Sequence, residues 1–294
     1  MEEPARRAAI ALYDRFTHGG MDRRTFMTEL ARVAGGAAAA AALLTSVAAR
    51  AEAQPVVRED DARIFTGTIR LKRGDRASTH YMAAPIAVAE GKRDAPAIIV
   101  VHENRGLNAH IKDVARRFAL QGYRALAPDS LAPVGDTPAD EDRARELIGQ
   151  LDLAAATEDI VQLVREQAGP QGARRPVGIV GFCWGGAMVH RVALAAGDAL
   201  AAGISFYGPA PDPAEATRLE SPLLVILAGR DERVNSSALP YVAAAQAAGK
   251  AVRAITYPEA DHAFHNDTSA ARYNPAAAGS AWGETVRFFR RHLR

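Results

Sequence analysis

Residues 177–186 read Val-Gly-Ile-Val-Gly-Phe-Cys-Trp-Gly-Gly, an apolar run followed by a cysteine between glycines. The run predicts a buried strand, and the residues from Gly186 onward predict a helix. Cys183 fits the pattern Gly-x-nucleophile-x-Gly, a strained turn in which larger flanking side chains would collide with the strand and the helix. Such a turn would hold the sulfur above the sheet edge, beside a helix N-terminus that favours the thiolate. We therefore expect Cys183 to be a nucleophile; the alternative is a small, buried apolar residue.

Apolar segments alternate with helix-like segments around this stretch, which predicts a mostly parallel central sheet with helices on both faces. The expected strands are Ile64–Leu71, Ala97–His102, Tyr123–Ala127, Val177–Gly181, Gly203–Tyr207, Leu223–Ala228 and Val252–Tyr257. The expected helices are Ala109–Gln121, Ala139–Gln150, Ala154–Gln167, Gly186–Ala195, Ala238–Ala248 and Ala276–Leu293. Pro128–Pro138, rich in Pro, Gly and Asp, is a candidate lid at the sheet edge where such folds bind ligands.

Two partners for Cys183 follow it in the chain, each just after a predicted strand. Asp231 comes first and His262 second, and nucleophile, acid and histidine is the order of the α/β-hydrolase fold. We expect His262 to be the base and Asp231 to orient it; alone, Asp231 is equally well read as a turn residue. His265 is the second candidate for the base. Asp261 is the second candidate for the acid, although its neighbour His262 should point elsewhere.

The loop after the strand that begins at Ala97 reads His-Glu-Asn-Arg-Gly from residue 102. This loop supplies one donor of the oxyanion hole in the fold, so we expect the backbone N–H groups of Asn104 and Trp184 to be the donors. Glu103 is a candidate to hold the thiol at rest or share its proton; the alternative is an exposed loop glutamate. His102 and Arg105 either line the pocket or only pack and solvate.

The first 53 residues differ in composition from the rest of the chain. Arg23 and Arg24 precede an Ala/Gly/Leu run, and small residues follow up to Ala53. This order is typical of a secretory signal, and the paired arginines resemble the twin-arginine consensus for bacterial export of folded proteins. We expect the twin-arginine export machinery to be a partner during translocation, cleavage after Ala53, and a folded domain of residues 54–294 that is periplasmic or secreted.

The alternatives for this segment remain open in the sequence. An Ala-rich helix packed on the domain fits the same composition, since alanine is a strong helix former. A leader that does not function would leave the protein in the cytoplasm, and residues 1–20 are either an extended leader or an over-long gene start. A permanent membrane anchor is not expected, because the apolar run from Val33 to Ala49 is short and dominated by Ala and Gly.

The composition excludes several function classes. The formal net charge is +2, and the basic residues are scattered without a long run, so nucleic acid is not an expected partner. A single cysteine allows no intramolecular disulfide and gives a redox site no resolving thiol. The eight histidines are dispersed along the sequence, so no metal site is expected.

Five motifs together resemble the dienelactone hydrolase family, whose members are also called carboxymethylenebutenolidases, over about Ile64 to Leu293. They are Val101-His102-Glu103, Ala127-Pro128-Asp129, the cysteine motif of residues 181–186, Gly229-Arg230-Asp231 and Asp261-His262-Ala263-Phe264. The resemblance implies an α/β-hydrolase fold with Cys183 as nucleophile, Asp231 and His262 as its partners, and Glu103 as the group that controls the thiol. It implies no metal and no organic cofactor.

The chain departs from this family at two positions. In well-known members one arginine shortly after the Pro-Asp pair and another four residues after the histidine grip the substrate carboxylate. Here Ser130, Leu131 and Ala132 follow the first position, and Asn266 occupies the second. Arg105 and Arg272 are the candidates to replace these cations.

The expected function is hydrolysis of a small ester or lactone through an acyl-enzyme on the cysteine. A peptidase or amidase on the same fold is an alternative, because a fold does not fix the chemistry. A non-catalytic small-molecule-binding protein that retains the turn is another, although a complete nucleophile, base and acid argue against it.

Overall fold

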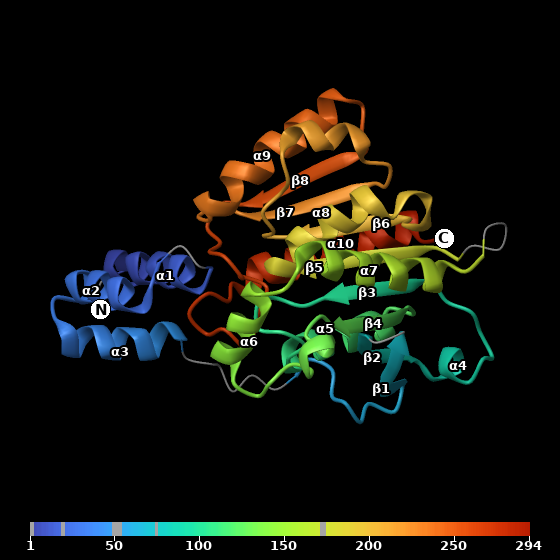
Figure 1. Ribbon diagram of the computed structural model, residues 1–294, viewed down its shortest axis with the longest axis horizontal. Helices are drawn as coiled ribbons and strands as arrows, with labels where there is room; N and C mark the ends of the chain where they lie inside the picture. The colour runs from blue at the N-terminus through green and yellow to red at the C-terminus, as the bar shows by residue number, and fades with distance from the viewer. Residues whose placement is uncertain (1–2, 19–20, 49–54, 74–75, 171–174) are drawn as a thin grey trace.

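The computed structural model describes residues 3–18, 21–48, 55–73, 76–170 and 175–294. Its centre is an eight-stranded sheet with the order β1-β2-β4-β3-β5-β6-β7-β8 (Figure 1). The strands are β1 (Ile64–Arg73), β2 (Arg76–Pro85), β3 (Ala97–Val101), β4 (Arg124–Asp129), β5 (Val177–Phe182), β6 (Ala202–Phe206), β7 (Leu223–Ala228) and β8 (Val252–Tyr257). β2 pairs antiparallel with β1 and β4, and every other pair is parallel. The predicted fold class is confirmed.

Helices cover both faces of the sheet. They are α4 (Ile86–Ala89), α5 (Ala109–Leu120), α6 (Glu141–Gly149), α7 (Leu153–Ala168), α8 (Trp184–Ala195), α9 (Glu232–Ala247) and α10 (Pro275–His292). Side chains along a strand alternate between the two faces, so Ile98 and Val100 of β3 enter one apolar layer while Ile99 and Val101 enter the other. The first layer is closed by α5 and α10 and the second by α7, α8 and α9. This double burial explains the continuous apolar runs in the sequence.

Among the elements that differ from the sequence predictions, β2 and α9 bear on the site. β2 was not predicted, because its sequence Arg-Ala-Ser-Thr-His-Tyr-Met-Ala-Ala-Pro lacks an apolar run, and its pairing with β1 and β4 makes it a strand. α9 begins at Glu232, ahead of the predicted Ala238, because the side chain of Asp231 accepts a hydrogen bond from the N–H of Val234 and caps the helix.

The loop predicted as a lid, Pro128–Pro138, is tied down around Asp129. The carboxylate of Asp129 accepts hydrogen bonds from the N–H groups of Leu131 at 2.9 Å and Thr137 at 2.7 Å. Beyond the loop, α6 places Glu141 at the pocket beside Cys183.

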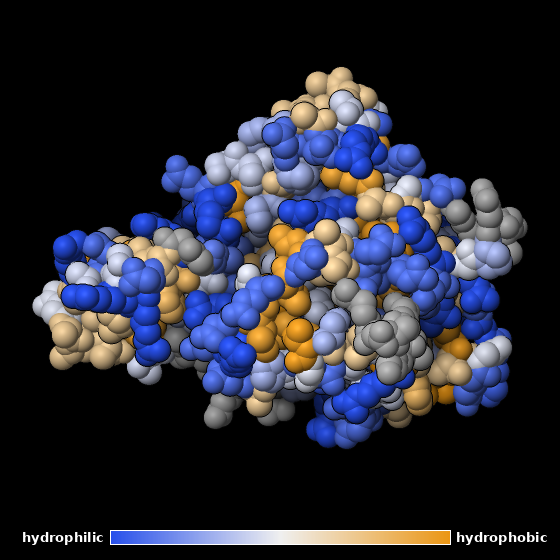
Figure 2. All heavy atoms as spheres, in the orientation of Figure 1, coloured by the Kyte–Doolittle hydropathy of each residue, from blue (hydrophilic) through white to orange (hydrophobic). Residues whose placement is uncertain are grey.

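Three helices precede the domain and lie at one side of it, at the left of Figure 1. They are α1 (Glu3–Thr17), α2 (Arg23–Ala34) and α3 (Ala37–Ala48). An apolar cluster of their own, with Phe26 and Leu30 buried at its centre, holds them together. The outer face of α3 is a weakly apolar surface, the pale tan patch at the lower left of Figure 2, formed by exposed alanines. We call α1, α2 and α3 the N-terminal helical segment.

The Ala-rich run of the sequence is therefore helical in this structure. The predicted cleavage position after Ala53 lies outside the described residues. Within the described part of the chain, no single helix is long and apolar enough to cross a membrane; α2 and α3 meet that test only as a pair, which is bent by 103°.

Candidate active site

Cys183 lies at the turn between β5 and α8. Its backbone has φ 55° and ψ −112°, a strained combination for a residue with a side chain. Packing requires the flanking glycines: a Cβ at Gly181 would lie 2.0 Å from the carbonyl oxygen of Gly185, and a Cβ at Gly185 would lie 2.4 Å from that of Val101. Trp184 is the first residue of α8, so the cysteine lies at the N-terminus of this helix. The turn has the geometry of a nucleophile elbow.

Asp231 and His262 come together beyond the ends of β7 and β8. Oδ2 of Asp231 lies 2.5 Å from Nδ1 of His262, and both side chains are buried. A ring nitrogen of His262 and Sγ of Cys183 are within 4.8 Å of each other. The sulfur, imidazole and carboxylate thus form a connected group at one edge of the sheet.

The charges around the sulfur favour its ionised form. Burial alone would raise the pKa of Cys183, but the positive charges of His18 and His262 outweigh burial and lower that pKa from 9.0 to about 6. Burial would lower the pKa of His262, but Asp14, Asp231 and the thiolate raise it well above its usual value. Both shifts favour a thiolate paired with imidazolium at neutral pH.

Glu103 is buried below the site and its carboxylate is fully engaged by two partners. Oε2 accepts a hydrogen bond from Nδ2 of Asn266 at 2.7 Å, and Oε1 accepts one from the hydroxyl of Tyr207 at 3.4 Å. Burial, and then the charges of Glu103 and Cys183, raise the pKa of Tyr207 well above its usual value, so the hydroxyl keeps its proton. Glu103 is not an exposed loop residue.

The loop after β3 lies at the same pocket as the sulfur. Asn104 and Cys183 line the same pocket, and the N–H of Trp184 has no carbonyl partner within α8 because it belongs to the first turn. His102 only packs: its ring is stacked on Trp184 with centroids 5.3 Å apart, and its Nε2 accepts a hydrogen bond from the N–H of Ser130. Burial lowers the pKa of His102, which keeps the ring neutral.

Arg105 and Arg272 both line this pocket. The guanidinium of Arg105 donates to the carboxylate of Glu141 and, at 2.7 Å, to the hydroxyl of Tyr13. Nε of Arg272 donates to Oγ of Ser269 at 2.9 Å. The two candidate cations therefore reach the pocket, but Arg105 is already paired there.

The two rival residues lie elsewhere. His265 is buried, packs against Phe182 with ring centroids 5.2 Å apart, and burial lowers its pKa well below the usual value. Asp261 is directed to Arg230, with 3.7 Å between the charged atoms. The structure thus brings His262 and Asp231 to the thiol side and leaves the rivals apart.

Comparison with known proteins agrees with this geometry. The sequence profile described as "Dienelactone hydrolase family" matches residues 82–293. The chain belongs to the dienelactone hydrolase family. Among its curated relatives is a protein of Methylorubrum extorquens named "Putative carboxymethylenebutenolidase", 32% identical over 255 residues that cover 82% of this chain and 86% of the relative.

Solved structures share the fold of this dienelactone hydrolase family member. The crystal structure named "Putative Dienelactone Hydrolase" from Klebsiella pneumoniae superposes with a TM-score of 0.66 at 26% identity and covers 77% of this chain and 98% of the other. An acylaminoacyl peptidase of Pyrococcus horikoshii has a TM-score of 0.60 at 20% identity, with 80% of this chain and 43% of the other covered. The second likeness shows the fold alone.

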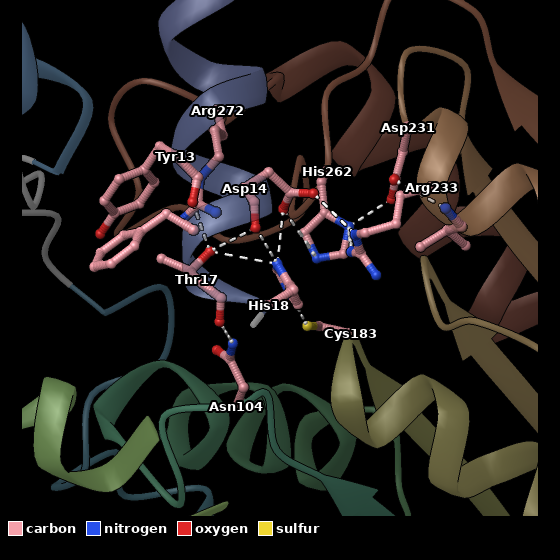
Figure 3. Close-up of polar contacts among 12 residues, drawn as sticks. Tyr13, Asp14, Thr17, His18, Asn104, Cys183, Asp231, Arg233, His262 and Arg272 are labelled. Atoms are coloured by element: carbon pink, nitrogen blue, oxygen red, sulfur yellow. Dashed lines mark hydrogen bonds and ion pairs between the residues drawn. The ribbon is translucent and has the colours of Figure 1, made fainter. Parts of the chain in front are cut away.

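The sequence analysis of this family member missed residues that come from α1. His18 has Nε2 3.0 Å from Sγ of Cys183, and Asp14 has Oδ1 3.9 Å from Nε2 of His262. Figure 3 shows His18 between Asp14 and the cysteine. Asp14 and His18 are four residues apart and so share one helix face, which was the only signal available in the sequence. Nothing in the sequence indicated that this face would meet residue 183.

Among the described residues, the side chains that could bind a metal ion are those of this same cluster. One nitrogen each of His18 and His262 and Sγ of Cys183 lie within 4.8 Å of one another, as do Asp14, Asp231 and His262. A thiolate with two imidazoles is a donor set that suits Zn²⁺. The sequence analysis expected no metal site because the histidines are dispersed along the chain, whereas in the structure two of them meet the cysteine in a set of this kind.

Proposed function

We propose that this dienelactone hydrolase family member cleaves a small carboxylic ester or lactone through a thioester on Cys183. The observation that carries the proposal is the sulfur in a strained elbow with the imidazole of His262 within 4.8 Å of it, and with Asp231 2.5 Å from the far side of that ring. Besides His18, the charge of His262 lowers the pKa of Cys183, and it is this pair within the hydrolase domain that would supply the thiolate for the reaction.

In the proposed acylation step, the thiolate of Cys183 attacks the carbonyl carbon and its electron pair forms the C–S bond. The carbonyl oxygen becomes an oxyanion, which the backbone N–H groups of Asn104 and Trp184 would stabilise. The C–O bond then breaks, and the departing alkoxide takes the proton of the His262 imidazolium. In a lactone, this alcohol stays attached to the acyl chain.

Deacylation returns the enzyme to its starting state. Neutral His262 takes a proton from water, and the resulting hydroxide attacks the thioester carbonyl. The second tetrahedral intermediate expels the Cys183 thiolate and releases the acid. Asp231 stabilises the imidazolium and fixes its ring through Nδ1, as the orienting acid of a triad does.

The side chains of the pocket support a polar substrate. Glu103 would act on the thiol indirectly, since its carboxylate is held by Tyr207 and Asn266. Asn266 occupies the position where well-known family members carry an arginine, so the substrate carboxylate would depend on Arg272 and Arg105. We therefore propose small esters and lactones as a class and assign no particular dienelactone.

The test compares the full chain with Cys183→Ala on aryl esters and unsaturated lactones, with turnover and intact mass measured in parallel. We expect a covalent acyl adduct and turnover in the wild type and neither in Cys183→Ala. Because the chain has one cysteine, any thiol adduct is assigned to residue 183 without mapping. A wild-type thiol that reacts with iodoacetamide but is acylated by no substrate would contradict the proposal and favour a binding protein. Activity on aminoacyl amides alone would favour a peptidase.

We also propose that residues 1–53 are a twin-arginine leader and that the mature domain is periplasmic. What supports this is the paired Arg23 and Arg24, both exposed at the start of α2. Intact-mass measurement of the protein from its native host tests it: the expected chain begins at Gln54 in the periplasmic fraction. A chain that begins at Met1 in the cytoplasm would contradict it.

A further inference from the structure

Helix α1 ends at the reactive sulfur. Nε2 of His18 lies 3.0 Å from Sγ of Cys183, and the same ring is held from behind by Asp14, whose carbonyl oxygen and Oδ1 lie 2.7 Å and 3.1 Å from Nδ1 (Figure 3). A substrate carbonyl carbon must come within about 3–3.5 Å of the sulfur to be attacked. The imidazole of His18 already occupies space at that distance.

Polar contacts fix α1 in this position. Nε of Arg233 donates to Oδ2 of Asp14 at 3.2 Å, and the guanidinium of Arg105 donates to the hydroxyl of Tyr13. Both partners belong to the hydrolase domain, and Arg105 is one of the two cations available to a substrate carboxylate. The helix therefore uses a group that substrate binding would require.

The end of α1 also meets the oxyanion loop. Nδ2 of Asn104 donates to the carbonyl oxygen of Thr17 at 3.0 Å, so a backbone carbonyl of the segment lies against this loop. The space that remains beside Cys183 is a cavity of about 30 Å³, and the cysteine is 3% exposed. Such a cavity admits a water molecule or two and no ester.

We propose that the mouth of this pocket is a docking surface for α1, and that docked α1 is an intramolecular inhibitor with His18 on the thiolate. That the inhibited activity is ester hydrolysis rests on the proposed function, whereas the inference that α1 covers the thiol does not. The N-terminal helical segment also carries Arg23 and Arg24. If it is the leader proposed above, its removal would uncover the site, and the folded enzyme would stay covered until export.

The experiment measures how fast iodoacetamide alkylates Cys183 in the full chain, with the rate taken from the high-pH plateau so that changes in the thiol pKa do not contribute. Asp14→Lys places a cation against Arg233 and protonated His262 and should push α1 out of the pocket. Glu29→Lys is the matched control, since it makes the same charge change on α2, where Glu29 pairs only with Arg32 of its own helix among the contacts described. Asp14→Asn removes the charge and keeps the shape.

We expect Asp14→Lys to be alkylated at least about tenfold faster than the wild type, because like charges that face each other in an interface oppose the contact. Asp14→Asn should fall between the two, and Glu29→Lys should match the wild type. Should Asp14→Lys fail to fold, as judged by thermal unfolding, Asp14→Asn against Glu29→Gln gives the same comparison.

Two results would overturn the proposal. Equal alkylation rates of Asp14→Lys and the wild type would show that α1 does not cover the thiol. Equal acceleration of alkylation by Asp14→Lys and Glu29→Lys would show that any charge reversal in the N-terminal helical segment exposes the thiol, so that the contact of Asp14 has no special role. Ester turnover, measured on the same samples, should rise with alkylation. Fast alkylation of Asp14→Lys without turnover on any ester would contradict the proposed hydrolase and still support α1 as the cover of the thiol.

Discussion

Two histidines from opposite ends of the chain reach the same sulfur, and their surroundings differ. His262 lies on the loop after β8, and Asp231 on the neighbouring loop holds its Nδ1. His18 directly follows the last residue of α1, and Asp14 of that helix holds its Nδ1. The first pair belongs to the hydrolase domain, whereas the second arrives only when the helix docks.

The two regions are also held by different forces. Asp231 follows the fully buried strand β7, and His262 follows β8, the edge strand that pairs with β7, so both loops are anchored on the central sheet. The N-terminal helical segment has its own apolar cluster and meets the active site through polar contacts such as Asp14 with Arg233. Such largely buried charged pairs contribute little net stability, because the cost of desolvating the charges offsets their attraction. The contact between His262 and Asp231 thus lasts as long as the domain is folded, whereas the contacts of α1 can break while the domain stays folded.

The largest expected effect is the difference in kcat between variants that lack His262 and variants that lack His18. His262→Ala should lower kcat by roughly 10⁴-fold or more, because removing the histidine of a catalytic triad costs at least about this much. His18→Ala should not lower it, since His18 supplies no step of the reaction. Steady-state kinetics on an aryl ester checks both variants. Equal losses would show that the two imidazoles share one catalytic role and would remove the distinction.

An effect of intermediate size concerns the ionisation of the thiol. The alkylation rate of the wild type should be at its plateau above pH 6 and fall as the pH drops through about 6, because protonation removes the thiolate. His18→Gln removes the first of the charges that lower this pKa, so the midpoint should move up by at least about one unit. The measurement is the pH profile of the alkylation rate, with His292→Gln at the end of α10 as the control. An unshifted midpoint would mean that His18 is uncharged or undocked.

The smallest expected effect is that of salt. If polar contacts hold α1 in place, sodium chloride raised from about 0.05 to 0.5 M should speed wild-type alkylation about two- to fivefold, as expected for screening of a partly exposed ion pair. Asp14→Lys, already undocked, should not respond. Alkylation rates at fixed pH over a salt series provide the check. A salt-independent wild type would indicate that apolar contacts dominate the docking.

Much of the domain could be predicted because its signals are local. The apolar runs of β3, β5 and β7 identify buried strands. The glycines around Cys183 identify a turn in which a Cβ at Gly181 or Gly185 would collide with the backbone. The polar edge strand β2 was missed, because it depends on pairing with β1 and β4. Asn266 was recognised only as a departure from the family, whereas its hydrogen bond to Glu103 joins two loops that lie far apart in the chain.

The sequence alone determined the fold class, the family, and the order of Cys183, Asp231 and His262 after their strands. These properties follow from hydrophobic periodicity and from motifs a few residues long. In both cases the residues that form the pattern are the same residues that form the structure. Only the tertiary structure decided that Asp14 and His18 lie at the sulfur. Their contacts join residues 165 positions apart in the chain, from His18 to Cys183, and no local pattern specifies which surface a helix meets.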